Sequence, residues 1–314
     1  MEKMLNLVPL PISAVMLSFA TLGNALKSIP YVRKIFGIIA GILFVVIMLK
    51  IIVTRDNFKK DMSNPIVASV FVTFFMGIVV LATYVNPFAH TLAIIMWFGG
   101  LILHFVTALY VFIHFIVPTK RVIPSHYVTF VGIVVASVTS PMFQLQIIGF
   151  VIFIIGFICF LILTPFVFKN LFKEDYIPKT VNPTKVIVAA PLSLCLSGYI
   201  SSASDVNITF SIFLALFSLL LTILGIYFIV SSFKKEFNPT YAAYTFPMVI
   251  SGVAMKNLVA VTTELAFNNL IQLIARIEVI IAACIVLFVL ILYIYDVMIS
   301  AQKASKYELN PKNK

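Results

Sequence analysis

Residues 238–248 read Asn-Pro-Thr-Tyr-Ala-Ala-Tyr-Thr-Phe-Pro-Met, and the Asn-Pro pair at their start also begins apolar stretches at 64–65 and 182–183. Prolines that open apolar stretches recur at intervals of 56, 59, 59 and 56 residues, namely Pro9, Pro65, Pro124, Pro183 and Pro239. A fixed period of this length is typical of one structural unit that is repeated along the chain. Because proline is favoured in the first turn of a helix, we expect five copies of a unit that begins with a helix.

The composition indicates the surroundings of these units. Hydrophobic residues make up 62% of the chain and charged residues 11%, and the mean hydropathy is +1.12. A soluble domain carries about 25% charged residues, so we expect an integral membrane protein. The three cysteines lie in apolar runs at unrelated spacings, and the four histidines lack the spacing of metal ligands. We therefore expect no metal, no cofactor and no enzymatic acid–base site.

Apolar stretches of the length that crosses a bilayer, about 20 residues, occur ten times. They lie at about 7–26, 34–53, 66–85, 91–117, 127–142, 145–168, 185–202, 208–232, 240–257 and 270–299, with a turn placed at 140–144 because 127–168 is too long for one span. We therefore predict an all-α integral membrane protein with a single transmembrane domain over residues 1–314. Its ten transmembrane helices form five repeated helical hairpins at about 7–53, 66–117, 127–168, 185–232 and 240–299, followed by a short cytoplasmic tail at 300–314.

The distribution of basic residues predicts the orientation. Sixteen of the 22 Lys and Arg residues fall on the side of the bundle that carries both termini, and four fall on the opposite side. Basic loops stay in the cytoplasm, so we expect cytoplasmic N- and C-termini in a multi-pass protein of the plasma membrane. The net charge of +11 mostly reflects this bias and does not indicate nucleic-acid binding.

The two helices of each predicted hairpin differ in composition. Gly, Ala, Ser and Thr supply 33 of 92 residues in the first (odd) helices but 23 of 126 in the second (even) helices. Small residues allow close helix packing, so we expect five inner, pore-lining odd helices and five outer even helices. Pro11, Pro191 and Pro247 lie inside odd spans. Interior prolines kink helices, and in membranes such breaks face protein or a water-filled cavity, which favours an inner wall that lines a path.

Ionisable residues are absent from the middle of every odd span. Coupled pumps usually keep such residues at membrane depth, so the pattern favours a neutral pore over a coupled carrier or an intramembrane enzyme. The charges that do fall inside spans lie in even helices. Arg276 and Glu278 are two residues apart and so do not face each other, and we expect each to have a structural partner elsewhere. Lys50 and Asp296 lie near span ends and are expected to extend toward the membrane surface.

Several of these motifs together resemble one family. They are Pro9-Leu10-Pro11 in the first span, Asn64-Pro65 before the third, Ala190-Pro191 in the seventh and Tyr244-Thr245-Phe246-Pro247-Met248 in the ninth. In this order, on five hairpins, they resemble the tellurite-resistance/dicarboxylate transporter (TDT) family, which includes bacterial tellurite-resistance protein A and the plant slow anion channels. The resemblance implies a homotrimer in which each protomer has its own pore along the odd helices. It also implies that a phenylalanine of the ninth helix closes the pore, and Phe246 is the matching residue.

Two functions remain open from the sequence. The first is a membrane channel that passes small inorganic or carboxylate anions through a central pore in each protomer, gated by the aromatic ring of Phe246. The alternative is a secondary carrier or exporter for C4-dicarboxylates such as malate, for sulfite or for tellurite-type oxyanions. The uncharged inner helices favour the channel, whereas the names of the family favour the carrier.

Overall fold

The computed structural model describes residues 2–173, 176–234 and 236–309, which form helices joined by short loops. The first two hairpins contain α1 (Glu2–Asn6), α2 (Ile12–Ala25), α3 (Val32–Val53), α4 (Arg55–Met62), α5 (Pro65–Val85) and α6 (His90–Val111), which continues through a π-helical turn, η1 (Phe112–Ile116), into α7 (Val117–Thr119). The third contains α8 (His126–Val131), η2 (Gly132–Val134), α9 (Val135–Thr139), η3 (Ser140–Phe143) and α10 (Gln146–Leu171). The last two contain η4 (Lys179–Ala189), α11 (Ala190–Ser202), α12 (Ile208–Ser232), η5 (Pro239–Tyr244), α13 (Thr245–Val261) and α14 (Asn268–Leu309).

Within the described residues, nine helical stretches are long and apolar enough to cross a membrane, and α2 is a tenth, shorter apolar helix. The predicted multi-span, all-helical fold is confirmed. The first span is shorter than the predicted 7–26 because α2 begins only after Pro9 and Pro11. The last helix is longer than the predicted 270–299, since α14 continues to Leu309 into the predicted tail, of which residues 310–314 lie outside the described part.

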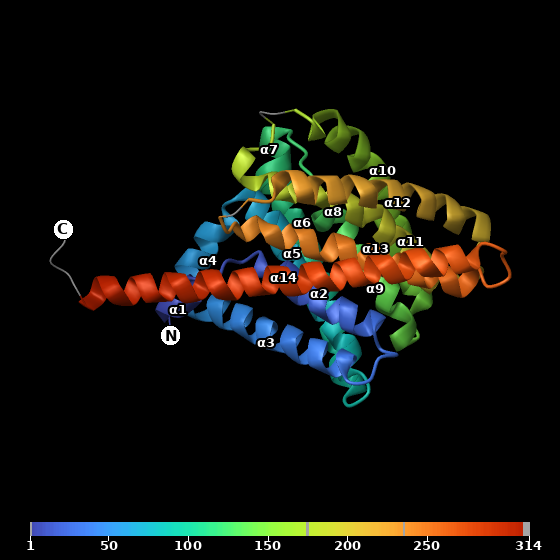
Figure 1. Cartoon of the computed structure of the whole chain (residues 1–314), viewed down its shortest axis with the longest axis horizontal. Coiled ribbons are helices and arrows are strands. Elements are labelled where there is room, and N and C mark those ends of the chain that lie inside the picture. Colours follow the sequence, from blue (N-terminus) through green and yellow to red (C-terminus); the bar gives the residue numbers. More distant parts are fainter. Residues whose placement is uncertain (1, 174–175, 235, 310–314) are drawn as a thin grey trace.

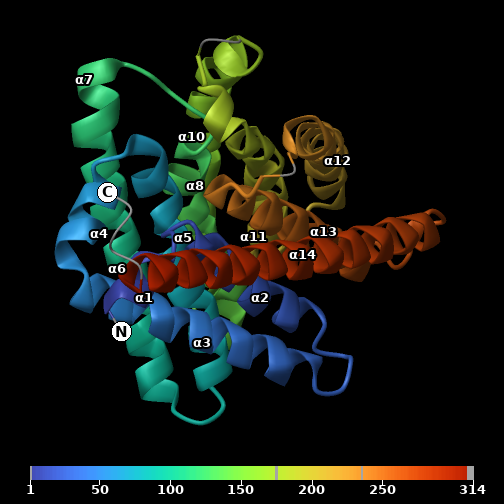
Figure 2. The ribbon, with the colours of Figure 1, turned by 60° about the vertical axis from the view of Figure 1, so that its left-hand side comes forward.

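The burial of the helices separates them into the two predicted sets. In each of four odd spans, between 72% and 83% of the residues in the most apolar 18-residue stretch are buried. These spans are α5, α8 to η3, η4–α11 and η5–α13, and most of α2 is buried as well. In the even spans α3, α6–α7, α10, α12 and α14 the buried share is only 22% to 33%. Figure 2 shows α3, α10 and α12 around the outside of the bundle and α5 and α11 within it. The even helices therefore leave most of their apolar surface exposed on the outside of the chain.

The odd helices close into a ring within one chain. The helix α2 packs against α5 and α13, α5 against α8 and α9, these against α11, and α11 against α13. Each even helix packs on the odd helix of its own hairpin, as α6 does on α5 and α14 on α13. The end of α14 lies at the same end of the bundle as α1 (Figure 1). A single chain thus supplies every helix that surrounds the central axis.

Of the three Asn-Pro pairs that precede predicted odd spans, two act as helix starts. The Asn64 side chain accepts hydrogen bonds from the backbone N–H groups of Ile66 (2.9 Å) and Val67 (3.2 Å), and Asn238 accepts one from Thr240 N (2.9 Å). These are N-caps in which the proline follows at the first helical position. The third pair, Asn182-Pro183, instead lies inside the 3₁₀ helix η4, so the expectation of a helix start there is wrong.

One close approach fixes the packing of the last hairpin. A Cβ atom added at Gly252 of α13 would lie 2.9 Å from Val279 Cγ2 and 3.1 Å from Val279 N of α14. The second of these contacts is with backbone, which cannot move aside as a side-chain end can. Glycine at this position therefore sets how close α13 and α14 lie, as small residues do between membrane helices generally.

Candidate functional site

Phe246 lies among the odd helices, beside a very small cavity. Its side chain is 3% exposed and lines a cavity of about 10 Å³, which has room for no more than about one water molecule. The other lining residues come from α5, from α8 to η2 and from the η4–α11 junction: Met76, Tyr127, Val128, Val131, Gly132, Ala190, Pro191 and Leu194. Apolar side chains from several odd helices thus converge on the Phe246 ring.

The three predicted kink prolines lie at or near the starts of α-helices. Pro11 is the N-cap residue of α2, Pro191 is in the first turn of α11, and Pro247 is the third residue of α13. Before Pro191 and Pro247 the chain is 3₁₀-helical, so the interior break takes the form of a change from 3₁₀ to α geometry. Of these three prolines, Pro191 alone is among the described residues that line the small cavity.

Thr245, the residue before Phe246, is hydrogen-bonded to α2, the first spanning helix. Ser18 Oγ of α2 lies 2.8 Å from Thr245 Oγ1 of α13 and 2.6 Å from the carbonyl oxygen of Ala14, and its single proton is donated to one of these two acceptors at a time. The Thr245 hydroxyl in turn donates to the carbonyl of Ala242 (2.8 Å). Both hydroxyl groups are fully buried. This contact joins the first and last repeats at the level of the Phe246 ring and closes the helix ring there.

A larger cavity begins one helical turn from Phe246. Ile250, Val253 and Asn257 follow Phe246 at spacings of four, three and four residues, which places all four on one face of α13. The last three line a cavity of about 270 Å³, which we call the vestibule. Its other lining residues are Thr21, Asn24, Ala25, Lys27, Val80, Val135, Val138, Thr139, Met142, Ser201 and Lys256, so all five odd segments contribute to its wall or rim.

The vestibule is positively charged and rich in hydrogen-bonding groups. Of the described residues that line it, two are lysines, Lys27 and Lys256, and none is acidic. The Lys256 ammonium donates a hydrogen bond to the carbonyl of Ala25, and Asn257 Nδ2 donates one to Ser197 Oγ at 2.8 Å. Ala25 is the last residue of α2, and Lys256 and Asn257 are near the end of α13; both helices end on the side of the bundle opposite to α1. A cleft lined by one sign of charge concentrates ions of the other sign, and this one attracts anions.

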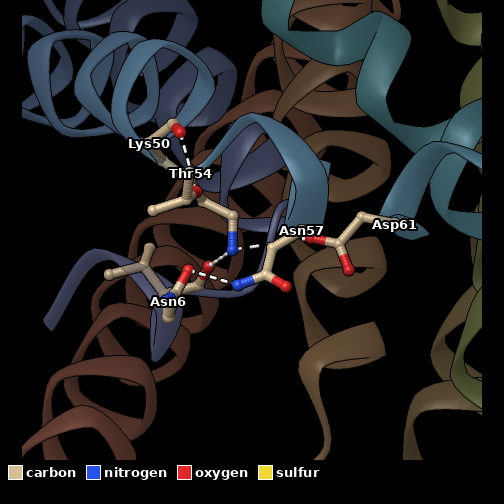
Figure 3. A network of polar contacts seen from close by, with 6 residues as sticks. Asn6, Lys50, Thr54, Asn57 and Asp61 are labelled. Carbon is tan, nitrogen blue, oxygen red and sulfur yellow. Dashed lines mark hydrogen bonds and ion pairs between the residues drawn. The ribbon is translucent and has the colours of Figure 1, made fainter. Parts of the chain in front are cut away.

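Lys50 has a different environment from the one expected, because it is buried rather than extended toward the membrane surface. Its side chain is 3% exposed, and its ammonium donates a hydrogen bond to the carbonyl of Val8 (2.6 Å) and pairs with Asp61 Oδ2 at 3.5 Å (Figure 3). Pro11 has no N–H, and the N–H of Ile12 bonds to Pro9 O, which leaves the Val8 carbonyl without a helical donor. Lys50 supplies that donor.

Glu278 has a partner on an inner helix. Ser251 Oγ of α13 donates a hydrogen bond to Glu278 Oε2 (3.0 Å), and the same hydroxyl is 2.8 Å from Thr222 Oγ1 of α12. The carboxylate therefore connects α14 with α13 and, through Ser251, with α12. Arg276 lines a separate cavity between α13, α14 and the α2–α3 loop, in keeping with the prediction that Arg276 and Glu278 do not face each other.

Over the described residues, no three His, Cys, Asp or Glu side chains lie together in an arrangement that holds a metal.

Comparison with known proteins assigns the family. A search of curated proteins returned no match. The family model described as SLAC1, voltage-dependent anion channel, matches residues 8–294, which is nearly the whole chain. This is the tellurite-resistance/dicarboxylate transporter family, a family of channels and transporters rather than of enzymes, so the predicted resemblance is confirmed. The chain is a multi-pass membrane protein and belongs to the SLAC1 family of anion channels and transporters.

Proposed function

We propose that this protein is an anion channel whose path follows the axis of the five odd helices and is closed by the ring of Phe246. The observation that carries the proposal is the arrangement along α13. Phe246 lines a cavity of about 10 Å³, and Ile250, Val253 and Asn257 on the same helix face line the vestibule of about 270 Å³. An ion that crosses the ring has to displace the Phe246 side chain. Apolar constrictions of this kind gate by excluding water.

Two features support an anion as the permeant species. The vestibule carries Lys27 and Lys256 without an acidic residue among its described lining residues. Its amide and hydroxyl groups, those of Asn24, Ser201 and Asn257 among them, can replace water around an ion that loses part of its hydration shell. Selectivity then comes from charge at the mouth and from the diameter of the apolar segment.

The test is chloride flux through purified protein in liposomes. We expect low flux for the wild type and a several-fold rise for Phe246→Ala, which we call the open variant. Phe74→Ala is the matched control, because Phe74 is also a buried inner-helix ring (1% exposed) but stacks on Phe44 and Phe71 away from both cavities. A rise in both variants would indicate general loosening of the bundle, and no rise in the open variant would remove the gate from Phe246.

The same liposomes separate a channel from a carrier. A carrier for malate, sulfite or a tellurite-type oxyanion gives saturable counterflow of the labelled anion without single-channel currents. A channel gives currents, and its flux does not depend on substrate on the far side. Counterflow without currents in both the wild type and the open variant would replace the channel with the carrier.

We also propose that the protein forms homotrimers in the plasma membrane with both termini in the cytoplasm, as family membership implies. The mass of the detergent-solubilised complex tests the assembly against one chain of 35.0 kDa. Because the ring of odd helices is complete within one chain, a monomer would rule out the trimer and leave the proposed path unchanged.

A further inference from the structure

A second polar cavity lies away from the central axis, between η4, the end of α10 and the end of α12. Its volume is about 290 Å³, and its described lining residues are Phe172, Lys179, Asn182, Lys185, Tyr227, Phe228, Ser231 and Ser232. It is found at the end of the bundle that carries α1 and the end of α14, because even helices end there and odd helices begin there. We call it the η4 pocket.

The η4 pocket combines groups that bind phosphate with groups that face lipid. Two lysines and the Asn182 amide offer donors, and no described lining residue is acidic. Ser231 and Ser232 also line the pocket, but their hydroxyl groups donate to the Phe228 carbonyl. On its rim Phe172 is 63% exposed and Tyr227 is 60% exposed. An ammonium pair beside exposed aromatic rings at the edge of a membrane span matches a headgroup phosphate with its acyl chains lying along the bundle.

One side of the η4 pocket is apolar and lies close to one of the two lysines. Phe228 is buried, its ring centre lies 6.1 Å from that of Phe172, and the Lys185 ammonium lies 5.9 Å from the Phe228 ring. The cation therefore lies within reach of an aromatic face that attracts it. A soluble anion gains nothing from the exposed rings of the rim, whereas a phospholipid contacts both the rings and the lysines.

The η4 pocket is connected to the segment that precedes Phe246. Ser232, which lines the pocket, lies 2.8 Å from the hydroxyl of Tyr244, and Tyr244 stacks on Tyr241 with ring centres 5.1 Å apart. Tyr241 in turn accepts a hydrogen bond from the backbone N–H of Lys234 at 2.8 Å. Tyr244 is the residue at the change from 3₁₀ to α geometry, two positions before Phe246.

We propose that the η4 pocket binds the phosphate of an anionic phospholipid through Lys179 and Lys185, and that the Ser232–Tyr244 contact transmits its occupancy to the start of α13. The binding half stands without the channel. The transmission half rests on the proposed function, because it is read out as flux through the path at Phe246.

Binding is tested by the thermal midpoint of the purified full chain in detergent, titrated with phosphatidylglycerol, with phosphatidylcholine or with inorganic phosphate. We expect phosphatidylglycerol alone to raise the wild-type midpoint. Lys179→Gln/Lys185→Gln should weaken its apparent affinity roughly 30-fold, at about 1 kcal/mol per lysine near the membrane surface. Lys179→Arg/Lys185→Arg keeps the charge and should keep the effect, which separates lost binding from lost folding.

The matched control is Lys59→Gln/Lys60→Gln, which removes the same charge from exposed lysines of α4 at the same end of the bundle. An equal loss of affinity in this control would reduce the effect to general surface charge and overturn the site. An equal rise of the midpoint with inorganic phosphate would overturn the lipid as its ligand.

Transmission is tested with Tyr244→Phe, which removes the hydroxyl that contacts Ser232 without changing the lining of the pocket. We expect wild-type chloride flux to differ between liposomes with and without phosphatidylglycerol, and the flux of Tyr244→Phe to lose that difference while the lipid-dependent midpoint remains. A retained difference would overturn the transmission half. Absence of flux in every variant, including the open variant, would count against the proposed function and leave the binding result standing.

Discussion

Lys50, the buried lysine of α3, allows a quantitative test of how the first span compensates for the N–H group that Pro11 lacks. Lys50→Met keeps the length of the side chain and removes the ammonium that bonds to the Val8 carbonyl. A buried carbonyl left without a donor costs about 1–3 kcal/mol. The ion pair adds less, about 0–1 kcal/mol, because Asp61 is 37% exposed and therefore screened by solvent. The expected loss of stability is about 1–4 kcal/mol, and it should lower the thermal midpoint in detergent by on the order of 5 °C.

A double-mutant cycle with Pro11 tests the cause. The N–H of Ile12 bonds to Pro9 O and that of Ser13 to Leu10 O, a 3₁₀ register in which an N–H at position 11 would point at the Val8 carbonyl. Pro11→Ala supplies that N–H, so Lys50→Met should cost about 1 kcal/mol less in the Pro11→Ala background. Lys59→Met, at an exposed lysine, is the control and should be nearly neutral. Equal costs of Lys50→Met in both backgrounds would refute the reasoning.

Three further predictions concern the inner helices. Gly252→Ala should destabilise the protein by about 1–3 kcal/mol because its methyl group meets the α14 backbone, whereas Gly41→Ala, with open space around it, should be neutral or stabilising in the same unfolding assay. Ser251→Ala should destabilise the protein by about 1–3 kcal/mol, because it leaves the Glu278 carboxylate of α14 without its described donor. Glu278→Gln in the Ser251→Ala background should restore part of this loss. Lys27→Gln/Lys256→Gln in the open variant should lower chloride current at low salt and converge with the open variant near 1 M, where the Debye length is about 3 Å; a deficit that persists at high salt would contradict an electrostatic role.

The repeat and the two classes of helix were predictable because each depends on local sequence. Asn64-Pro65 and Asn238-Pro239 carry their capping groups within three residues, and the small residues of the odd spans are visible as composition. Asn182-Pro183 has the same dipeptide but lies inside η4, which begins at Lys179. The dipeptide alone does not distinguish the two cases, because tertiary packing decides where the 3₁₀ segment begins.

The contacts that were not predicted join residues far apart in the chain. Lys50 and Val8 are 42 positions apart, and sequence reasoning that weighs only the distance of a lysine from the span end places its ammonium in water. A signal was present, since Pro9-Leu10-Pro11 leaves a carbonyl that needs a donor. The vestibule had a signal too, because Asn257 lies on the same helical face as Phe246. Which polar residues of α2 and α11 meet it depends on the closure of the ring.

Single-channel recording of Phe246→Ala in planar bilayers tests the central claim most directly. The account predicts that this variant conducts more than the wild type. In a chloride gradient its reversal potential should lie near that of chloride, because the path passes the lysine-lined vestibule. Phe74→Ala should resemble the wild type. Currents of Phe246→Ala no larger than those of the wild type, or a reversal potential near that of the cation, would contradict an anion path closed at Phe246.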